Sequence, residues 1–207
     1  MSLPLVSCCC LTYGRIDRLQ EALACFLAQD YAGPKELVIL NSLPDQTLSF
    51  SHPEVRIVNL PKRPPNLGAT RNLAVSECRG EIVLPYDDDD IYLPQFIRAH
   101  EFRPEDQWVQ VVPAWQSHGG KLKGVARGGF PIQVGFRKSA WEQIGGYPQK
   151  NSGEDQDFRD TLSKLPGRRI EGSSWQAVFG YGWGNGVWHI SGAGEDRSGQ
   201  PTGWEKS

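Results

Sequence analysis

Apolar runs alternate with helically spaced apolar residues over the first ninety residues of the chain. Leu5 to Leu11 is apolar or small at every position, which is typical of a strand buried on both faces. The stretch 15–29 repeats apolar residues on one helix face: Ile16, Leu19, Leu23, Phe26 and Leu27. Further strands are expected at 37–40, 55–58 and 82–84, and a helix at 66–78 that Gly80 caps. This alternation predicts a parallel, doubly wound α/β sheet.

Shorter elements follow in the second half of the chain. Helices are expected at 94–102, 139–144 and 154–165. Strands are expected at 108–112, 121–127, 132–137, 169–171, 176–181 and 187–190. Glycine and charged residues dominate from Ser191 onward, which predicts a flexible tail over 191–207.

Four consecutive carboxylates, Asp87 to Asp90, follow the apolar run Ile82 to Leu84. Two unit charges about 6 Å apart repel by roughly 0.7 kcal/mol in water and by about 3 kcal/mol at an effective dielectric near 20. Four of them at the end of a buried strand therefore call for a cation. A solvated acidic loop is the simpler interpretation, but ligands of open α/β sheets bind beyond the carboxyl ends of strands. The position favours a site for a hard divalent ion.

Composition narrows the class of protein. The 207 residues are 39% apolar and 22% charged, with a net charge of −2 and a pI of about 6.1, so nucleic acid is not indicated as a partner. No apolar run approaches the ~20 residues of a transmembrane helix, and Met1 to Pro4 leads directly into a strand without a signal peptide. The spacing of the five cysteines fits neither a disulfide framework nor a zinc site. We therefore expect buried, reduced thiols and a cytoplasmic location.

Several short motifs occur in order between residues 5 and 165. They are Thr12-Tyr13-Gly14-Arg15, Asn66-Leu67-Gly68 with Arg71-Asn72, Gly80-Glu81 ahead of the acidic run, Gly145-Gly146-Tyr147 and Glu154-Asp155-Gln156-Asp157. Each motif alone is weak, but the ordered set resembles a family 2 glycosyltransferase of the GT-A fold. The resemblance implies a Rossmann-like, mostly parallel central sheet flanked by helices, with a smaller mixed sheet on the acceptor side. It also implies one domain over 1–207, with a nucleotide-binding half at 1–90 and an acceptor-binding half at 91–190.

A metal site is implied by the same resemblance. Mn²⁺ or Mg²⁺ would act as a Lewis acid on the diphosphate of a nucleotide sugar. Asp89 is expected to bind the ion directly, and Asp87 to face the ribose or the ion through water. Asp88 lies at the variable position of the motif and is counted among the donor-binding residues, and Asp90 is expected to orient the donor sugar. With four aspartates in a row the register is open by one residue.

Two of these metal and donor assignments have structural alternatives. Asp90 could instead cap the helix expected near Pro94. His189 is expected either to be a third metal ligand, as in some GT-A enzymes, or to be a structural histidine.

The remaining donor contacts come from the ends of other strands. Thr12, Tyr13 and Arg15 match the place where the family holds the nucleotide, and Tyr13 can stack on a base; an ordinary first-turn role remains open for Arg15. Asn41 stands where the family usually has an acidic residue beside the base, and its amide can still hydrogen-bond a pyrimidine edge. Asn66 belongs to the donor-binding motif. Arg71 is expected to contact the diphosphate, or to form a buried ion pair with the acidic run.

Asp155 is the expected catalytic base, with Glu154 as the second choice. An inverting transfer needs one base to take the proton of the attacking acceptor hydroxyl. The structural alternative is that both acids stabilise the N-terminus of a helix. The sequence thus predicts transfer from a nucleoside diphosphate sugar, UDP-linked by preference, to a carbohydrate or other hydroxyl acceptor.

Two other functions are weighed against this one. One is a nucleotidyltransferase, which the loop Thr12 to Arg15 matches poorly because such enzymes usually carry a Gly-rich, Lys/Arg-bearing loop there. The other is a non-catalytic protein that binds a nucleotide sugar or a divalent ion, a reading favoured by the short chain and by Asn41.

Overall fold

The computed structural model describes residues 2–112, 114–118, 121–126, 134–171 and 179–183. A seven-stranded sheet in the order β10-β6-β9-β4-β1-β2-β3 forms its centre. All neighbouring strands in it are parallel except the pairs that involve β9. The strands are β1 (Val6–Thr12), β2 (Lys35–Asn41), β3 (Val55–Asn59), β4 (Ile82–Pro85), β6 (Trp108–Val112), β9 (Val134–Arg137) and β10 (Gly167–Glu171). The expected mostly parallel α/β sheet is confirmed.

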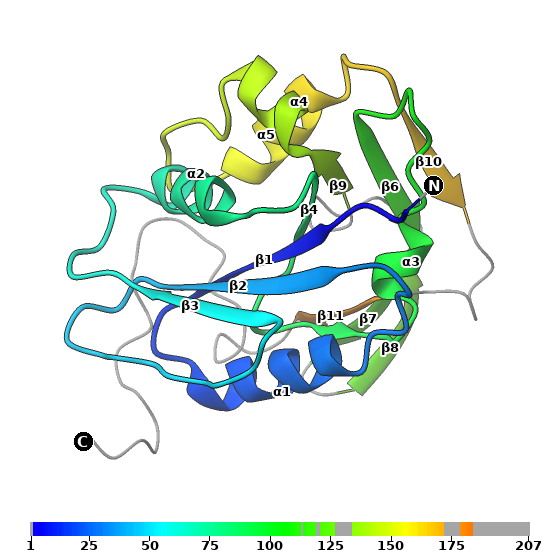
Figure 1. The fold of residues 1–207 in the computed structure, drawn as a ribbon. Coiled ribbons are helices and arrows are strands. Elements are labelled where there is room, and N and C mark those ends of the chain that lie inside the picture. The colour runs from blue at the N-terminus through cyan, green and yellow to red at the C-terminus, as the bar shows by residue number, and fades with distance from the viewer. Residues whose placement is uncertain (1, 113, 119–120, 127–133, 172–178, 184–207) are drawn as a thin grey trace.

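Helices cover both faces of this sheet, as Figure 1 shows. Helix α1 lies on one face, and α2, α4 and α5 lie on the other. The helices are α1 (Ile16–Leu27), α2 (Leu67–Glu77), α3 (Phe96–Ala99), α4 (Lys138–Ile144) and α5 (Glu154–Leu162). None of the helices in the described part of the chain is long and apolar enough to cross a membrane.

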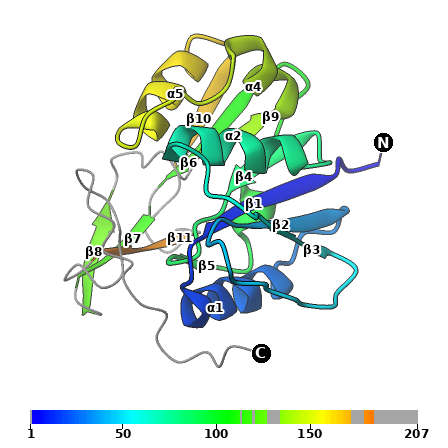
Figure 2. The same cartoon turned by 90° about the vertical axis from the view of Figure 1, so that its left-hand side faces the viewer.

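A second sheet of four strands stands beside the first (Figure 2). Its order is β5-β11-β7-β8, with one parallel and two antiparallel pairs. The strands are β5 (Ile91–Tyr92), β7 (Ala114–His118), β8 (Lys121–Ala126) and β11 (Phe179–Trp183). This is the smaller mixed sheet that the family resemblance implies. Strands β5 and β7 were not among the expected elements, because β5 has only two residues and the sequence of β7, Ala-Trp-Gln-Ser-His, contains no β-branched apolar run.

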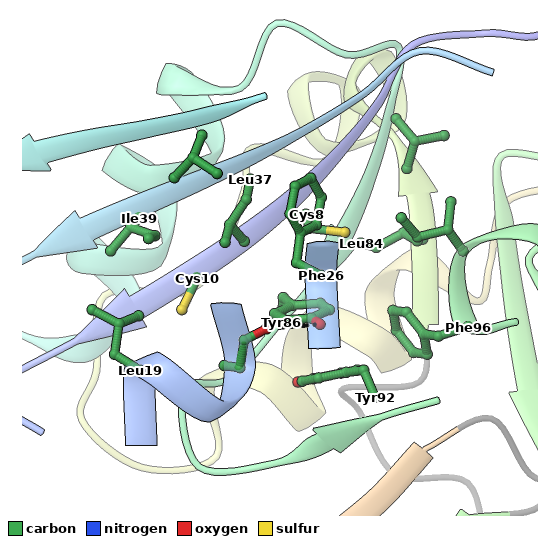
Figure 3. Close-up of a cluster of buried hydrophobic side chains, with 14 of the residues drawn as sticks. Cys8, Cys10, Leu19, Phe26, Leu37, Ile39, Leu84, Tyr86, Tyr92 and Phe96 are labelled. Carbon is green, nitrogen blue, oxygen red and sulfur yellow. Dashed lines mark hydrogen bonds between the residues drawn. The ribbon is translucent and has the colours of Figure 1, made fainter. Parts of the chain in front are cut away.

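The three consecutive cysteines of β1 pack on both faces of the central sheet. Successive strand residues point to opposite faces. Cys8 and Cys10 therefore pack with Phe26 in the cluster under α1, and Cys9 packs in the cluster under α2. Figure 3 shows the α1 side, where Cys8 and Cys10 lie among the buried side chains. The thiols of Cys8, Cys9, Cys10 and Cys78 are buried, as expected, while that of Cys25 is partly exposed.

Tyr86 fixes the point where β4 passes into the acidic run. Its backbone N–H donates to Cys9 O at 2.9 Å, and its hydroxyl donates to Ala22 O at 3.2 Å. Its ring stacks on Tyr92 with 3.6 Å between centroids, and Phe96 meets it edge-on at 5.9 Å (Figure 3). The residue directly before Asp87 is therefore part of the core.

One local expectation, for Gly80, and one structural alternative, for Asp90, are wrong. Gly80 does not cap α2, which ends at Glu77 and has Cys78, in an extended conformation, as its C-cap. Gly80 instead lies against β1, where its N–H donates to Ser7 Oγ at 2.8 Å and a Cβ would crowd that strand. Asp90 does not cap the following helix, because α3 begins only at Phe96, with Gln95 at its N-cap.

Candidate functional site

Three parallel strands end at one edge of the central sheet. Thr12 at the end of β1 lies opposite Asn41 at the end of β2, and Pro85 at the end of β4 lies opposite Cys9. The acidic run Asp87 to Asp90 follows β4 immediately. This is the edge where open α/β folds bind ligands.

Asp87, Asp89 and Asp90 bring their carboxylates together. One oxygen from each lies within 4.8 Å of the others. Asp90 is buried, while Asp87 and Asp89 are partly exposed. Carboxylate oxygens are the ligands that Mg²⁺ and other hard cations prefer, so this donor set fits the metal that the sequence predicts.

Asp88 does not belong to this group of three carboxylates. Its side chain is fully buried and forms an ion pair with Arg15, whose other arm donates to Asp89 Oδ2 at 2.7 Å. Burial raises the pKa of the Asp88 carboxyl to about 7, although Arg15 acts to lower it. In this structure Asp88 therefore holds Arg15, and Arg15 in turn contacts Asp89.

Arg71 links the acidic run to the second half of the chain. Its Nε donates to Glu154 Oε1 at 3.0 Å, and its Nη1 lies 3.6 Å from Asp87 Oδ1. Glu154 is 2% exposed, so its carboxylate is committed to this contact. The buried ion pair expected for Arg71 is present, and Glu154 is its closer partner.

Asp155 lines a cleft that Arg71 and Asp87 also line. The cleft is lined by Arg71, Pro85, Asp87, Val134, Tyr147, Asp155, Phe158 and Arg159. Asp155 is partly exposed, and its Oδ1 accepts the N–H of Gln156 at 2.8 Å. Of the two acids at the start of α5, Asp155 faces the cleft and Glu154 anchors the helix to Arg71.

Asn66 and the residues after it join α2 to the loop before α5. Asn66 is the N-cap of α2, where its Oδ1 accepts the N–H of Ala69 at 2.8 Å. Gly68 donates its N–H to Lys150 O at 3.1 Å, and a Cβ on it would overlap the carbonyl oxygen of Pro148. The motif Asn66-Leu67-Gly68 therefore permits a close backbone approach between the two halves.

Asn72 fixes the Gly145-Gly146-Tyr147 turn, a role that the sequence did not reveal. Its Oδ1 accepts from the N–H of Tyr147 at 2.7 Å and from Trp141 Nε1 at 3.0 Å, and its Nδ2 donates to Tyr147 O at 2.8 Å. Tyr147 lines the cleft, stacked on Phe158 at 3.9 Å between centroids. The sequence feature that could have suggested this role is that Asn72 directly follows Arg71 in the motif Arg71-Asn72.

Thr12 and Asn41 are buried at the strand ends. Thr12 is 2% exposed, and its carbonyl accepts the N–H of Ser42 at 3.0 Å. Asn41 has no exposed surface; its Nδ2 donates to Gln46 O at 2.8 Å and to Asn59 Oδ1 at 3.0 Å. In this structure Asn41 organises the loop after β2 and presents no atom to the surface.

Tyr13 is partly exposed beside these buried residues. The guanidinium of Arg63, a residue that the sequence analysis did not single out, lies 4.3 Å from the centroid of its ring. Tyr13 can therefore offer an aromatic face near the acidic run. His189 and the tail from residue 191 lie outside the described residues.

Solved structures share this fold at low sequence identity. TarS of S. aureus, residues 1–349 in complex with UDP-GlcNAc, has a TM-score of 0.65 at 17% identity, covering 96% of this chain and 61% of that one. The mannosyltransferase PcManGT of Pyrobaculum calidifontis, in complex with GDP-Man and Mn²⁺, has a TM-score of 0.62 at 19% identity, covering 86% of this chain and 56% of that one. The chain thus spans about 60% of TarS 1–349 and 36% of the longer TarS structure. No curated protein sequence matches it.

A family model described as "Glycosyl transferase family 2" matches residues 7–158. This range includes β1 except for Val6, the acidic run and the first turn of α5, and it makes up well over half of the 207 residues. The sequence model and the GT-A architecture of the neighbouring structures agree with each other. The chain therefore belongs to glycosyl transferase family 2.

Proposed function

We propose that this chain is a metal-dependent, inverting glycosyltransferase that moves a sugar from a nucleoside diphosphate donor to a hydroxyl acceptor. The main support is the arrangement around Arg71, which contacts both Asp87 and Glu154 and lines the same cleft as Asp155. A group that binds the leaving diphosphate and a group that accepts a proton need to face one reaction centre, and in this cleft Arg71 and Asp155 would take these two roles.

Asp87, Asp89 and Asp90 would hold Mn²⁺ or Mg²⁺. When bound, the ion supplies Lewis-acid stabilisation of the diphosphate leaving group. The three-carboxylate donor set supports this assignment, and so does the similarity of fold to a mannosyltransferase whose structure was solved with GDP-Man and Mn²⁺. Arg71 would add a fixed positive charge near the same leaving group.

Asp155 would act as the general base for the acceptor hydroxyl. Its carboxylate lines the cleft, and α5, which carries it, is held to α2 by the contact between Glu154 and Arg71. Holding the base on a rigid element keeps it within reach of the attacking oxygen. Glu154, the second choice, is assigned a positioning role.

Tyr13 would stack on the base of the donor, and a UDP-linked donor is our first choice. The neighbouring structures contain UDP-GlcNAc in one case and GDP-Man in the other, so both bases belong in the test.

The five cysteines are all unpaired in the described part of the chain, which supports a reducing, cytoplasmic location.

The test is to measure release of UDP or GDP from a panel of nucleotide sugars with and without Mn²⁺. We expect turnover that depends on the ion and falls by at least about a hundredfold in Asp89→Ala and in Asp155→Asn, because metal and base each contribute terms of that size. Asp157→Asn is the matched control, since Asp157 is exposed on the same helix and pairs with Lys150. Donor binding without turnover would instead favour the non-catalytic binding protein.

A further inference from the structure

Arg15 inserts its guanidinium between two carboxylates of the acidic run. Its Nη1 donates to Asp89 Oδ2 at 2.7 Å, and its Nη2 forms an ion pair with Asp88 Oδ1. Arg15 lies in the loop after β1, at the N-cap of α1, and the two aspartates follow 73 and 74 residues later. The fold therefore brings a fixed cation to the carboxylates from a distant part of the sequence.

The two contacts of Arg15 differ in how firmly the fold holds them. The Asp88 side chain has no exposed surface, so removing its cation would leave a buried carboxylate without a counter-charge. The side chain of Asp89 is 5% exposed and also belongs to the group of three carboxylates that can surround a metal ion. Asp88 thus holds Arg15 in place, and Asp89 is shared between Arg15 and the proposed ion.

We infer that Arg15 is a built-in cation that competes with the divalent metal ion for Asp89 and so lowers the metal affinity of the site. The inference rests on the proposed function only for the presence of the ion. A cation bound by Asp89 comes close to the guanidinium, and at the low effective dielectric of a buried site this repulsion is strong. Metal binding and the contact between Arg15 and Asp89 therefore oppose each other, while the contact with Asp88 does not involve the three carboxylates of the metal site.

The charges around the acidic run allow a clean test. At about pH 8, above the pKa of about 7 of the Asp88 carboxyl, all four aspartates count as ionised, and together with Arg15 and Arg71 they carry a net charge of −2. The double variant Arg15→Gln/Asp88→Asn removes one charge of each sign, so the net charge stays at −2 while the guanidinium is removed from Asp89. Asp88→Asn alone lowers the net charge to −1 and keeps Arg15 on Asp89. The pair of variants separates direct competition from overall charge.

The experiment is a calorimetric titration of Mn²⁺ alone, without nucleotide, into the full chain and its variants. We expect the Kd for Mn²⁺ to fall about tenfold in the double variant and to rise about threefold in Asp88→Asn, from the change in charge next to the ion. Arg18→Gln is the matched control, because Arg18 lies in the first turn of α1 and pairs with Glu21 on its surface. Its Kd should equal that of the parent.

A Kd for the double variant within twofold of the parent value would overturn the inference and leave the proposed function standing. Absence of Mn²⁺ binding in every protein, parent included, would overturn both the inference and the metal dependence of the proposed function. If the double variant shows no cooperative unfolding and is therefore not folded, the single variant Arg15→Lys is titrated in its place. A lysine ammonium is a point charge that cannot span two carboxylates, so we expect metal binding tighter than in the parent by about threefold. Equal affinity there would also overturn the inference.

Discussion

Arg71 on α2 and Glu154 at the start of α5 are joined by a hydrogen bond of 3.0 Å between Nε and Oε1. The two residues are 83 positions apart, and both side chains are at most 15% exposed. Because Arg71 also approaches Asp87, this one contact ties the acidic run to the helix that carries Asp155. It is the polar link between the proposed metal site and the proposed base.

Glu154→Gln should weaken this link without changing the shape of the side chain. An amide accepts a hydrogen bond from Arg71 but does not balance its charge, so the free energy of unfolding should fall by about 1–3 kcal/mol. Urea unfolding followed by circular dichroism measures the change. Asp157→Asn, which touches only the exposed pair with Lys150, should change stability by less than about 1 kcal/mol. Equal effects of the two substitutions would contradict the anchoring role of Glu154.

Gly145 and Gly146 offer a matched pair of substitutions. Both have left-handed backbone conformations, with φ of 82° and 77°, so alanine is strained at either site by about 1–2 kcal/mol. A Cβ on Gly145 meets no atom within 4 Å, whereas one on Gly146 would overlap Asn72 Oδ1 and lie 2.9 Å from Trp141 Nε1. Gly146→Ala should therefore destabilise the protein more than Gly145→Ala, by at least about 1 kcal/mol in thermal or urea unfolding. The reverse order would show that Asn72 can move aside at little cost.

The five thiols should differ in their reactivity toward the disulfide reagent DTNB. Cys8, Cys9, Cys10 and Cys78 are buried, and burial raises the pKa of the Cys8 and Cys10 thiols well above the usual value. Cys25 is partly exposed, and burial raises its pKa as well. We expect one thiol to react slowly in the native protein and five to react in denaturant, because the thiolate is the reactive form. Cys25→Ser should abolish the native-state reaction.

Asp106 should make stability depend on pH in the acidic range. Burial acts to raise the pKa of its carboxyl, but the N–H of Arg103 and the guanidinium of Arg168 lower it, and the net shift is downward. A lowered folded-state pKa stabilises the fold above the unfolded value of about 4, and this contribution is lost as the pH falls through the folded value. Asp106→Asn should therefore cost about 1–3 kcal/mol at pH 7.

The comparison of Asp106→Asn with the parent has to be made at several pH values. The difference in unfolding free energy between the two proteins should shrink steadily below about pH 4, where the parent carboxyl becomes protonated. A difference that stays constant from pH 7 to pH 3 would rule out the ion pair with Arg168 as its source.

The local sequence pattern was sufficient to predict an element where that element is long, and to predict a site where its residues are consecutive in the sequence. The strands and helices of residues 5–85 follow their apolar periodicity, and the acidic run lies at a strand end as expected. The first and last residues of β1 and α2 differ from the expected ones by one residue, which is within the usual uncertainty of helix and strand ends. The two-residue strand β5 carried no usable signal, because it exists only through its pairing with β11.

The sequence by itself determined the α/β class, the order of the elements, the acidic strand end and the motifs of the family, since each of these is written in neighbouring residues. Only the tertiary structure decided that Asp88 forms an ion pair with Arg15 and that Glu154 forms one with Arg71. It also decided that the Asn41 side chain hydrogen-bonds within the loop after β2. The physical reason is that a polar side chain takes its role from its partners and its burial. For Arg15 and Arg71 those partners lie more than seventy residues away in the chain, and folding alone brings them within hydrogen-bonding distance.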